Sequence, residues 1–208
     1  KARYDLVRQM RASIGVMGPL VAKRGKAVIS QPGGCAIGHR PINLHLHGLK
    51  AMGARYEQAG GGNISVTARK LNGADIFLGG PFGSSVLATA NVMSAACLAK
   101  GATMIESAAC EPEIVDLADF LNKMGAKISG QGSPRIVIEG VKKLGGAEHK
   151  VIPDRIEAGT FMIAAAMSGG EVVIKNCRLD HMLAVVDNLR RIGAKVEKLN
   201  GANGEETG

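Results

Sequence analysis

The sequence has very few aromatic residues, with no tryptophan, two tyrosines and four phenylalanines among its 208 residues. A buried core must therefore consist mainly of aliphatic side chains. Proteins that bind single-stranded nucleic acid use aromatic side chains as stacking platforms, and the sequence shows neither a zinc-finger spacing nor a recognition-helix pattern. The net charge of +8 then favours small phosphorylated ligands over nucleic acid, although a solvated basic surface is a simpler alternative.

Metal-ligand spacings, disulfide patterns and long apolar runs are also lacking. The four cysteines, Cys35, Cys97, Cys110 and Cys177, form no CxxC pair, so we expect neither a metal nor another cofactor. Cys97 lies in an apolar run and is expected in the core. No apolar run reaches the roughly 18 residues of a membrane span, and no secretory leader is visible. We therefore expect a cytoplasmic protein without a membrane partner. The chain begins at Lys1 and not at a methionine, which is consistent with a fragment of a longer protein.

The clearest feature that is present in the sequence is an internal repeat. Gly53, Gly125 and Gly193 lie 72 and 68 residues apart, and each is followed by alanine. Before each glycine lies an amphipathic run with helical spacing, and before that run lies a short β-branched stretch. Those stretches, at 26–30, 103–107 and 171–175, predict strands, as do the residues just after each glycine.

Helix-like runs precede each of these strands, at 6–23, 87–100 and 159–168. Together with extra strands between the copies, they predict an α/β fold of repeated βαβαββ units of about 70 residues. One such unit cannot bury all its apolar faces, so several must pack around a shared core. Chance similarity among amphipathic helices is the alternative interpretation.

Residues 31–41, with the sequence QPGGCAIGHRP, form the candidate reactive loop. Its glycines and prolines predict a loop between a strand and a helix, where functional residues are commonly held. His39 and Arg40 would favour the thiolate form of Cys35. The cysteine could act as a nucleophile or a proton donor, and a purely structural cysteine is the alternative interpretation.

Further candidates could bind anions. Arg11 and Arg40 offer planar guanidinium groups suited to phosphate or carboxylate. The loop 79–85 ends in Ser84 and Ser85 just before a predicted helix, where backbone N–H groups favour anions. That loop lacks the lysine of a P-loop, and a plain helix N-cap explains it equally well.

Other titratable residues have structural explanations that are simpler than catalysis. His45 and His47, two residues apart in a predicted helix, point to different sides and do not predict a metal pair. Four acids at predicted helix starts fit capping better than acid–base chemistry: Glu111, Glu113, Asp154 and Glu157.

Four segments of the chain resemble the UDP-N-acetylglucosamine enolpyruvyl transferases: MRAS, PGGCAIGHRPINLHLHGL, EPEIVDLADFLNKMGAKISGQG and PDRIEAGTF. The resemblance runs from about Tyr4 to Val196. It implies an inside-out α/β barrel of two lobes, each with three βαβαββ units and with the active site between them. Residues 1–152 would then be two units of one lobe, and residues 153–208 would begin the other, so that the fold is incomplete.

The resemblance also implies an activity without a cofactor, namely transfer of the enolpyruvyl group of phosphoenolpyruvate to the 3′-hydroxyl of UDP-N-acetylglucosamine with release of phosphate. This is the first committed step of peptidoglycan synthesis. Cys35 would protonate the substrate methylene and be alkylated by fosfomycin, and Arg40 would contact phosphoenolpyruvate. Further substrate contacts are implied for Arg11, Arg40, Pro41, Ile42, Asn43, Leu44, Ser84 and Ser85.

The chain departs from the family pattern in three ways. Asn43 stands where many members carry aspartate, and the loop 79–85 is longer and lacks their lysine. The family's Lys–Asn pair, catalytic aspartate and second-lobe arginine are not among these 208 residues, so we expect the isolated chain to be inactive. A non-catalytic nucleotide-sugar-binding module is one alternative. Another is a related enzyme, such as a shikimate-pathway transferase or an RNA terminal-phosphate cyclase, although the cysteine loop speaks against both.

Overall fold

The computed structural model describes residues 4–7, 9–30, 33 and 41–199. The chain divides into two compact units, Lys1–His149 and Lys150–Gly208. This division falls three residues before the boundary between residues 152 and 153 that the resemblance implied. The assignment of the units to two different lobes stays a prediction.

The first unit contains two copies of the repeat. The first copy has an antiparallel sheet of order β1-β3-β2. Two helical segments precede β1 and one helix lies between β1 and β2, and a short helix, α1 (Tyr4–Val7), precedes them all. The elements of this copy are η1 (Arg11–Val16), α2 (Met17–Arg24), β1 (Lys26–Ser30), α3 (Asn43–Ala51), β2 (Arg55–Ala59) and β3 (Asn63–Thr67).

The helix-like run at residues 6–23 does not form one regular α-helix in the described residues. Residues 11–16 form a 3₁₀ turn, and the regular α-helix begins only at Met17. Pro19 accounts for this start, since proline has no N–H and its ring would clash with the carbonyl four residues earlier in a helix interior. Within the first turn of α2 proline is tolerated, so the helix starts close to it.

The second copy is a complete βαβαββ unit, as the repeat predicted. Its strands have the order β4-β5-β7-β6, with β4 parallel to β5 and the other pairs antiparallel. In both copies the last strand lies between the two strands that precede it in the chain, and the second copy adds β4 at one edge. The elements are β4 (Asp75–Phe77), α4 (Val86–Ala96), β5 (Ala102–Glu106), α5 (Pro112–Lys123), β6 (Lys127–Ser129) and β7 (Arg135–Glu139).

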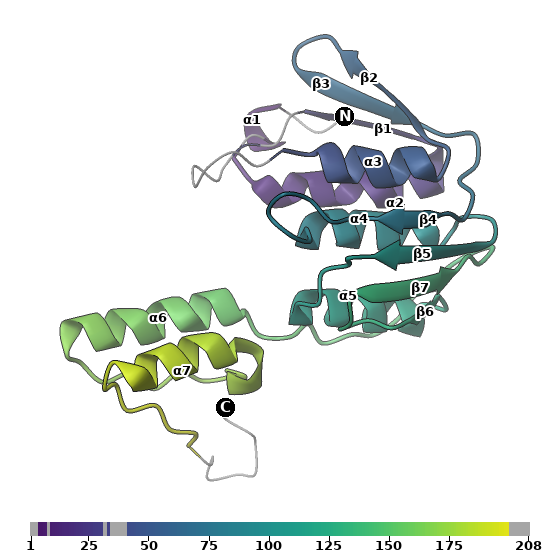
Figure 1. The fold of residues 1–208 in the computed structure, drawn as a ribbon. Helices are drawn as coiled ribbons and strands as arrows, with labels where there is room; N and C mark the ends of the chain where they lie inside the picture. The colour runs from purple at the N-terminus through teal and green to yellow at the C-terminus, as the bar shows by residue number, and fades with distance from the viewer. Residues whose placement is uncertain (1–3, 8, 31–32, 34–40, 200–208) are drawn as a thin grey trace. The chain divides into compact units, whose positions relative to one another are not determined.

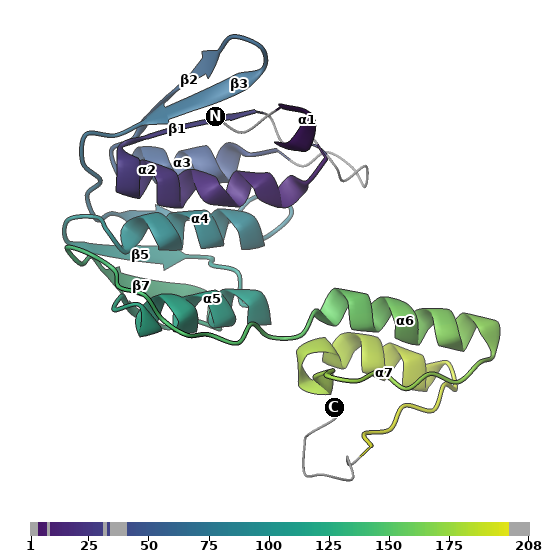
Figure 2. The same ribbon diagram turned by 180° about the vertical axis from the view of Figure 1, so that it is seen from behind.

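Helix α4 lies at the centre of the first unit. It packs against α2, α3 and α5, while the sheets cover the outer sides of the helices (Figures 1 and 2). The interior between them is aliphatic, as the shortage of aromatic residues predicted, with Leu49, Met52, Val92, Met93 and Ile105 all fully buried. Because α4 has neighbours on several sides, most of its residues are apolar and seven of its residues in all are buried.

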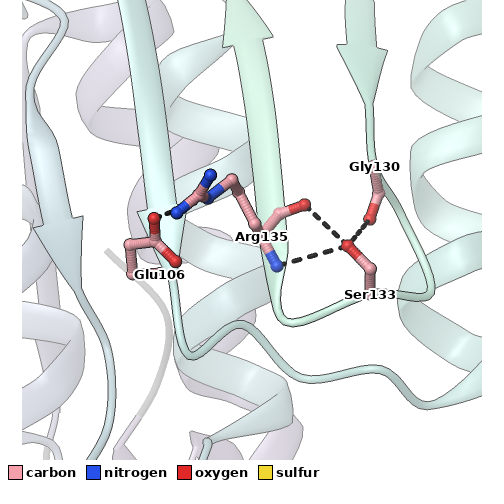
Figure 3. A network of polar contacts seen from close by, with 4 residues as sticks. All are labelled: Glu106, Gly130, Ser133 and Arg135. Carbon is pink, nitrogen blue, oxygen red and sulfur yellow. Dashed lines mark hydrogen bonds and ion pairs between the residues drawn. The ribbon is translucent and has the colours of Figure 1, made fainter.

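A short turn joins β6 to β7 and begins with Gly130, Gln131 and Gly132, the last three residues of the third family-like segment (Figure 3). Gly130 has φ = +81°, a conformation that glycine adopts at little cost. The Ser133 hydroxyl lies 2.8 Å from the Gly130 carbonyl oxygen and 2.9 Å from that of Arg135, either of which it can donate to. Across the sheet, Arg135 Nε donates to Glu106 Oε1 at 2.6 Å, a pair exposed enough to contribute little stability.

The second unit contains the helices of the third copy. Asp154 caps α6 (Arg155–Ser168) by accepting hydrogen bonds from the backbone N–H groups of Ile156 and Glu157, at 2.8 and 3.0 Å. This confirms the capping interpretation of Asp154. The short η2 (Leu179–Met182) leads into α7 (Leu183–Arg191), after which Gly193 has φ = +94°.

The strands expected in this third copy are a wrong prediction for the described residues. Residues 171–175 and 194–198 form no strand and have no regular secondary structure. They line a cavity of about 780 Å³ together with the end of α6. In the first two copies the strand before the second helix and the strand after it are joined only through the last strand of the copy, which begins ten residues after the shared glycine. The same spacing from Gly193 reaches residues 203–207, NGEET, which contain no valine, isoleucine or aromatic residue to form such a strand.

Candidate functional site

Three segments that the sequence singled out come together in the first unit. Arg11, at the start of η1, donates a hydrogen bond from Nη2 to the backbone oxygen of Pro41 at 3.3 Å. Leu44, in the first turn of α3, lies against Gly80, since a Cβ added at Gly80 would be 3.4 Å from Leu44 Cδ1. The 79–85 loop therefore borders the start of α3, and Pro41, two residues before α3, contacts Arg11.

The 79–85 loop ends in a capped helix. Gly80 and Gly83 exchange two backbone hydrogen bonds of 2.9 and 3.0 Å, which close a tight turn. Ser85 is the N-cap of α4, and its hydroxyl accepts a hydrogen bond from the Ala88 N–H at 3.3 Å. The capping interpretation of Ser85 is thus confirmed, while Ser84 is exposed and can donate to a ligand.

A buried polar cluster links these segments behind the surface. Asn91 of α4, which is fully buried, accepts a hydrogen bond at Oδ1 from the Gly18 N–H at 2.7 Å. Its Nδ2 lies 2.9 Å from the Ile14 carbonyl oxygen and 2.8 Å from Nδ1 of His45. Asn91 and its three partners form one hydrogen-bonded group, the Asn91 cluster, which consists of Ile14, Gly18, His45 and Asn91.

The cluster fixes the protonation of His45. Because the Gly18 N–H can only donate, Asn91 must present its oxygen to Gly18 and its NH₂ group to the other two partners. Nδ1 of His45 therefore accepts, and the proton of the neutral ring resides on Nε2. Burial, and then the positive charge of Arg11, lower the pKa of His45 to about 4, in agreement with a neutral ring.

The predicted catalytic residues Cys35 and Arg40 lie outside the described residues. Among the other cysteines, Cys97 is buried in the core as predicted, and burial raises the pKa of its thiol to about 11 despite a backbone hydrogen bond. Cys177 is also buried, whereas Cys110 is exposed. In the part of the chain that the structure describes, no three His, Cys, Asp or Glu side chains form a metal-binding group, and no helix there is long and apolar enough to span a membrane.

Sequence reasoning missed the role of Asn91 and treated His45 only as half of a histidine pair. Two signals could have found them. His45 shares the buried face of α3 with Leu49 and Met52, at helical spacing, and is 1% exposed. Asn91 is a polar residue in the otherwise apolar centre of α4, and a buried amide in such a place needs hydrogen-bond partners.

Comparison with known proteins supports the resemblance seen in the sequence. The model of the family EPSP synthase (3-phosphoshikimate 1-carboxyvinyltransferase) matches residues 1–207. The UDP-N-acetylglucosamine 1-carboxyvinyltransferase 1 of Caldanaerobacter subterraneus subsp. tengcongensis is 57% identical over 97% of this chain and 48% of its own length. A protein named UDP-N-acetylglucosamine 1-carboxyvinyltransferase from Akkermansia muciniphila is 55% identical over 95% of this chain and 46% of its own length.

Solved structures show the same fold. The enolpyruvyl transferase NikO from Streptomyces tendae has a TM-score of 0.69 at 20% identity, covering 95% of this chain and 47% of that one. EPSP synthase from Acinetobacter baumannii has a TM-score of 0.66 at 24% identity, covering 96% and 44%. The chain spans about half the length of the curated relatives it matches. The predicted resemblance and α/β fold class are confirmed, and the chain belongs to the EPSP synthase family of carboxyvinyltransferases.

Proposed function

We propose that the protein carrying this chain transfers the enolpyruvyl group of phosphoenolpyruvate to the 3′-hydroxyl of UDP-N-acetylglucosamine. The observation that carries this proposal is the 53–57% identity, over nearly the whole chain, to relatives named for that activity. The contact of Arg11 with Pro41 supports it, because it brings a guanidinium group to the segment where the resemblance implies nucleotide binding. In this role the protein would act in the cytoplasm, in the first committed step of peptidoglycan synthesis, and so support cell shape and division.

In the proposed reaction, both lobes implied by the resemblance supply reacting groups. The thiol of Cys35 gives a proton to the C3 methylene of phosphoenolpyruvate, which makes C2 electrophilic, and the sugar 3′-oxygen bonds to C2. The hydroxyl proton goes to a base, which the resemblance implies is an aspartate outside these 208 residues. The bond between C2 and the phosphate oxygen then breaks with its electron pair leaving on phosphate, while the Cys35 thiolate takes a proton back from C3, which restores the carbon–carbon double bond. Arg40 would balance the charge of phosphoenolpyruvate as it binds.

The nucleotide sugar would lie along Arg40, Pro41, Ile42, Asn43 and Leu44. Its diphosphate would meet the start of α4, where Ser84 is exposed and the helix dipole favours anions. Asn43 is exposed at the start of α3, and its amide can both donate to and accept from a base edge. This differs from an aspartate, which when ionised only accepts.

Phosphate release tests the proposal directly. The full-length protein should release phosphate from phosphoenolpyruvate only when UDP-N-acetylglucosamine is present. Cys35→Ser should lower kcat by about 100-fold or more, the usual range for loss of a general acid. Cys110→Ser is the matched control, since Cys110 is an exposed thiol of the same unit, and it should keep full activity. Equal activity of Cys35→Ser and wild type would contradict the assignment.

Covalent labelling tests the cysteine independently of turnover. Fosfomycin should add to the peptide containing Cys35 and leave the exposed Cys110 unmodified, as seen in the masses of the proteolytic peptides. Absence of label in an active full-length protein would favour a related enzyme without this cysteine chemistry.

The alternative of a nucleotide-sugar-binding module applies to the 208-residue chain by itself. The proposed substrate residues from Arg11 to Ser85 all belong to the compact first unit, so binding without turnover is expected for this chain. In calorimetry with UDP-N-acetylglucosamine, Arg11→Ala should weaken binding about tenfold or more, the loss expected for one charge-assisted hydrogen bond. Arg24→Ala removes an equal charge at the exposed end of α2 and should change the Kd little. Phosphate release by this chain alone would refute the expected inactivity.

A further inference from the structure

The Asn91 cluster joins the three backbone segments that carry the proposed substrate residues. Ile14 belongs to η1, which begins with Arg11, and Gly18 follows in α2. His45 lies in the first turn of α3, two residues after Asn43. Asn91 itself lies in α4, six residues after the cap Ser85. One amide side chain therefore bonds to both of the other segments at once.

The cluster has no freedom to rearrange around Asn91. Each of the two amide hydrogens and the amide oxygen has a partner at 2.7–2.9 Å. The backbones are also in close contact, because a Cβ at Gly18 would overlap the Asn91 carbonyl oxygen and lie 2.8 Å from the carbonyl carbon. A buried amide with all its hydrogen bonds made resists displacement, since any shift leaves a polar group without a partner.

The cluster also lies next to the substrate arginine. Arg11 is close enough to His45 for its charge to disfavour a protonated ring, and it donates to Pro41, four residues before His45. A change in the angle between η1 and α3 would move the guanidinium group of Arg11 relative to residues 41–44.

On the basis of the proposed function, we propose that Asn91 is a positioning residue that sets Arg11 and residues 41–44 in the arrangement that binds the nucleotide sugar. It acts through Ile14, Gly18 and His45 and does not touch the substrate. Its loss should therefore weaken nucleotide-sugar binding more than it weakens phosphoenolpyruvate binding or the chemical step.

Steady-state kinetics of Asn91→Leu in the full-length protein tests this role. We expect the KM for UDP-N-acetylglucosamine to rise by about tenfold or more, with much smaller changes in kcat and in the KM for phosphoenolpyruvate, because misplaced binding groups act mainly on the ligand they hold. In Asn91→Asp the carboxylate can still accept hydrogen bonds from the Gly18 N–H and from a protonated ring nitrogen of His45. The KM of this variant for UDP-N-acetylglucosamine should therefore lie between those of wild type and Asn91→Leu.

Asn122→Leu is the matched control. Asn122 of α5 also makes paired amide hydrogen bonds, at 2.9 Å to the Ile128 oxygen and 2.8 Å from the Ile128 N–H, but it joins α5 to β6 instead. Both leucine variants should lower the urea midpoint, and only Asn91→Leu should raise the KM. A merely structural Asn91 would give the two variants the same kinetic profile, which would overturn the proposal.

A measurement without substrate separates this inference from the proposed function. In ¹H–¹⁵N spectra of the 208-residue chain, Asn91→Leu should shift the backbone amides of residues 11–13 and 42–44, whereas Asn122→Leu should not. If residues 11–13 and 42–44 keep their wild-type shifts in Asn91→Leu, the positioning role is wrong whether or not the protein turns over substrate. If they move but the wild-type enzyme shows no enolpyruvyl transfer, the positioning stands and the proposed function fails.

Discussion

Two glycines three residues apart should respond to alanine in opposite directions. At Gly18 a Cβ would overlap the backbone of Asn91, whereas at Gly15 it would meet nothing within 4 Å. Overpacking in a tight core costs about 1–3 kcal/mol, and at Gly18 the obstacle is backbone of α4, which cannot rotate away. Alanine reduces the entropy of the unfolded chain at both sites, which stabilises by about 0.4–1 kcal/mol.

The net expectation is a loss of about 1 kcal/mol for Gly18→Ala and a gain of about 0.5 kcal/mol for Gly15→Ala. For a protein of this size the former corresponds to a fall in Tm of roughly 2–4 °C. Both tyrosines, Tyr4 and Tyr56, belong to the first unit, and the chain has no tryptophan. Tyrosine fluorescence during urea unfolding therefore reports on the first unit alone.

The comparison between the two variants is what tests the packing of α2 against α4. The urea midpoint should fall for Gly18→Ala and stay level or rise for Gly15→Ala, with unchanged slopes. If Gly18→Ala proved as stable as wild type, the close approach of Gly18 to Asn91 would be wrong, and the geometry of the Asn91 cluster with it.

Three further predictions concern protonation, capping and thiol reactivity. The pKa of His45 is about 4 when folded against 6.5 in the unfolded chain, so its contribution of about 3 kcal/mol is complete above pH 6.5 and is lost as the pH falls toward 4. His45→Gln should flatten this part of the curve of unfolding free energy against pH, and an unchanged curve would show that His45 is not the group responsible. Asp154→Ala removes the cap of α6 and should cost about 1 kcal/mol, seen as faster amide exchange in the first turn of α6, whereas Asp187→Ala, an exposed change in α7, should leave that turn unaffected. Iodoacetamide should modify Cys110 quickly and the buried Cys97 only after unfolding, and equal rates under native conditions would contradict the burial of Cys97.

Local sequence patterns predicted most of the first unit. The β-branched run at 26–30 forms β1, and the amphipathic run before Gly125 forms α5. Gly125 itself has φ = +99°, which explains why a glycine recurs where each helix ends. These features depend on residues close together in the chain, so the sequence alone determines them.

The same patterns were wrong for the third copy, because a strand also needs a partner. The run at 171–175 has the composition of a strand, but its hydrogen-bonding groups must pair with another segment. That pairing depends on the last strand of the copy, which the corresponding sequence at 203–207 is poorly suited to form. The composition of residues 171–175 thus predicted a preference for strand conformation, but it could not predict whether a sheet forms around them.

The sequence by itself determined the family, through the cysteine loop and the other matching segments, and the repeated α/β architecture, through the periodicity of its helices and glycines. Only the tertiary structure revealed that Asn91 bonds to Gly18, 73 residues away, and to His45, 46 residues away. The physical reason is that helix and turn preferences are local, whereas the partner of a buried amide is decided by which helices pack together.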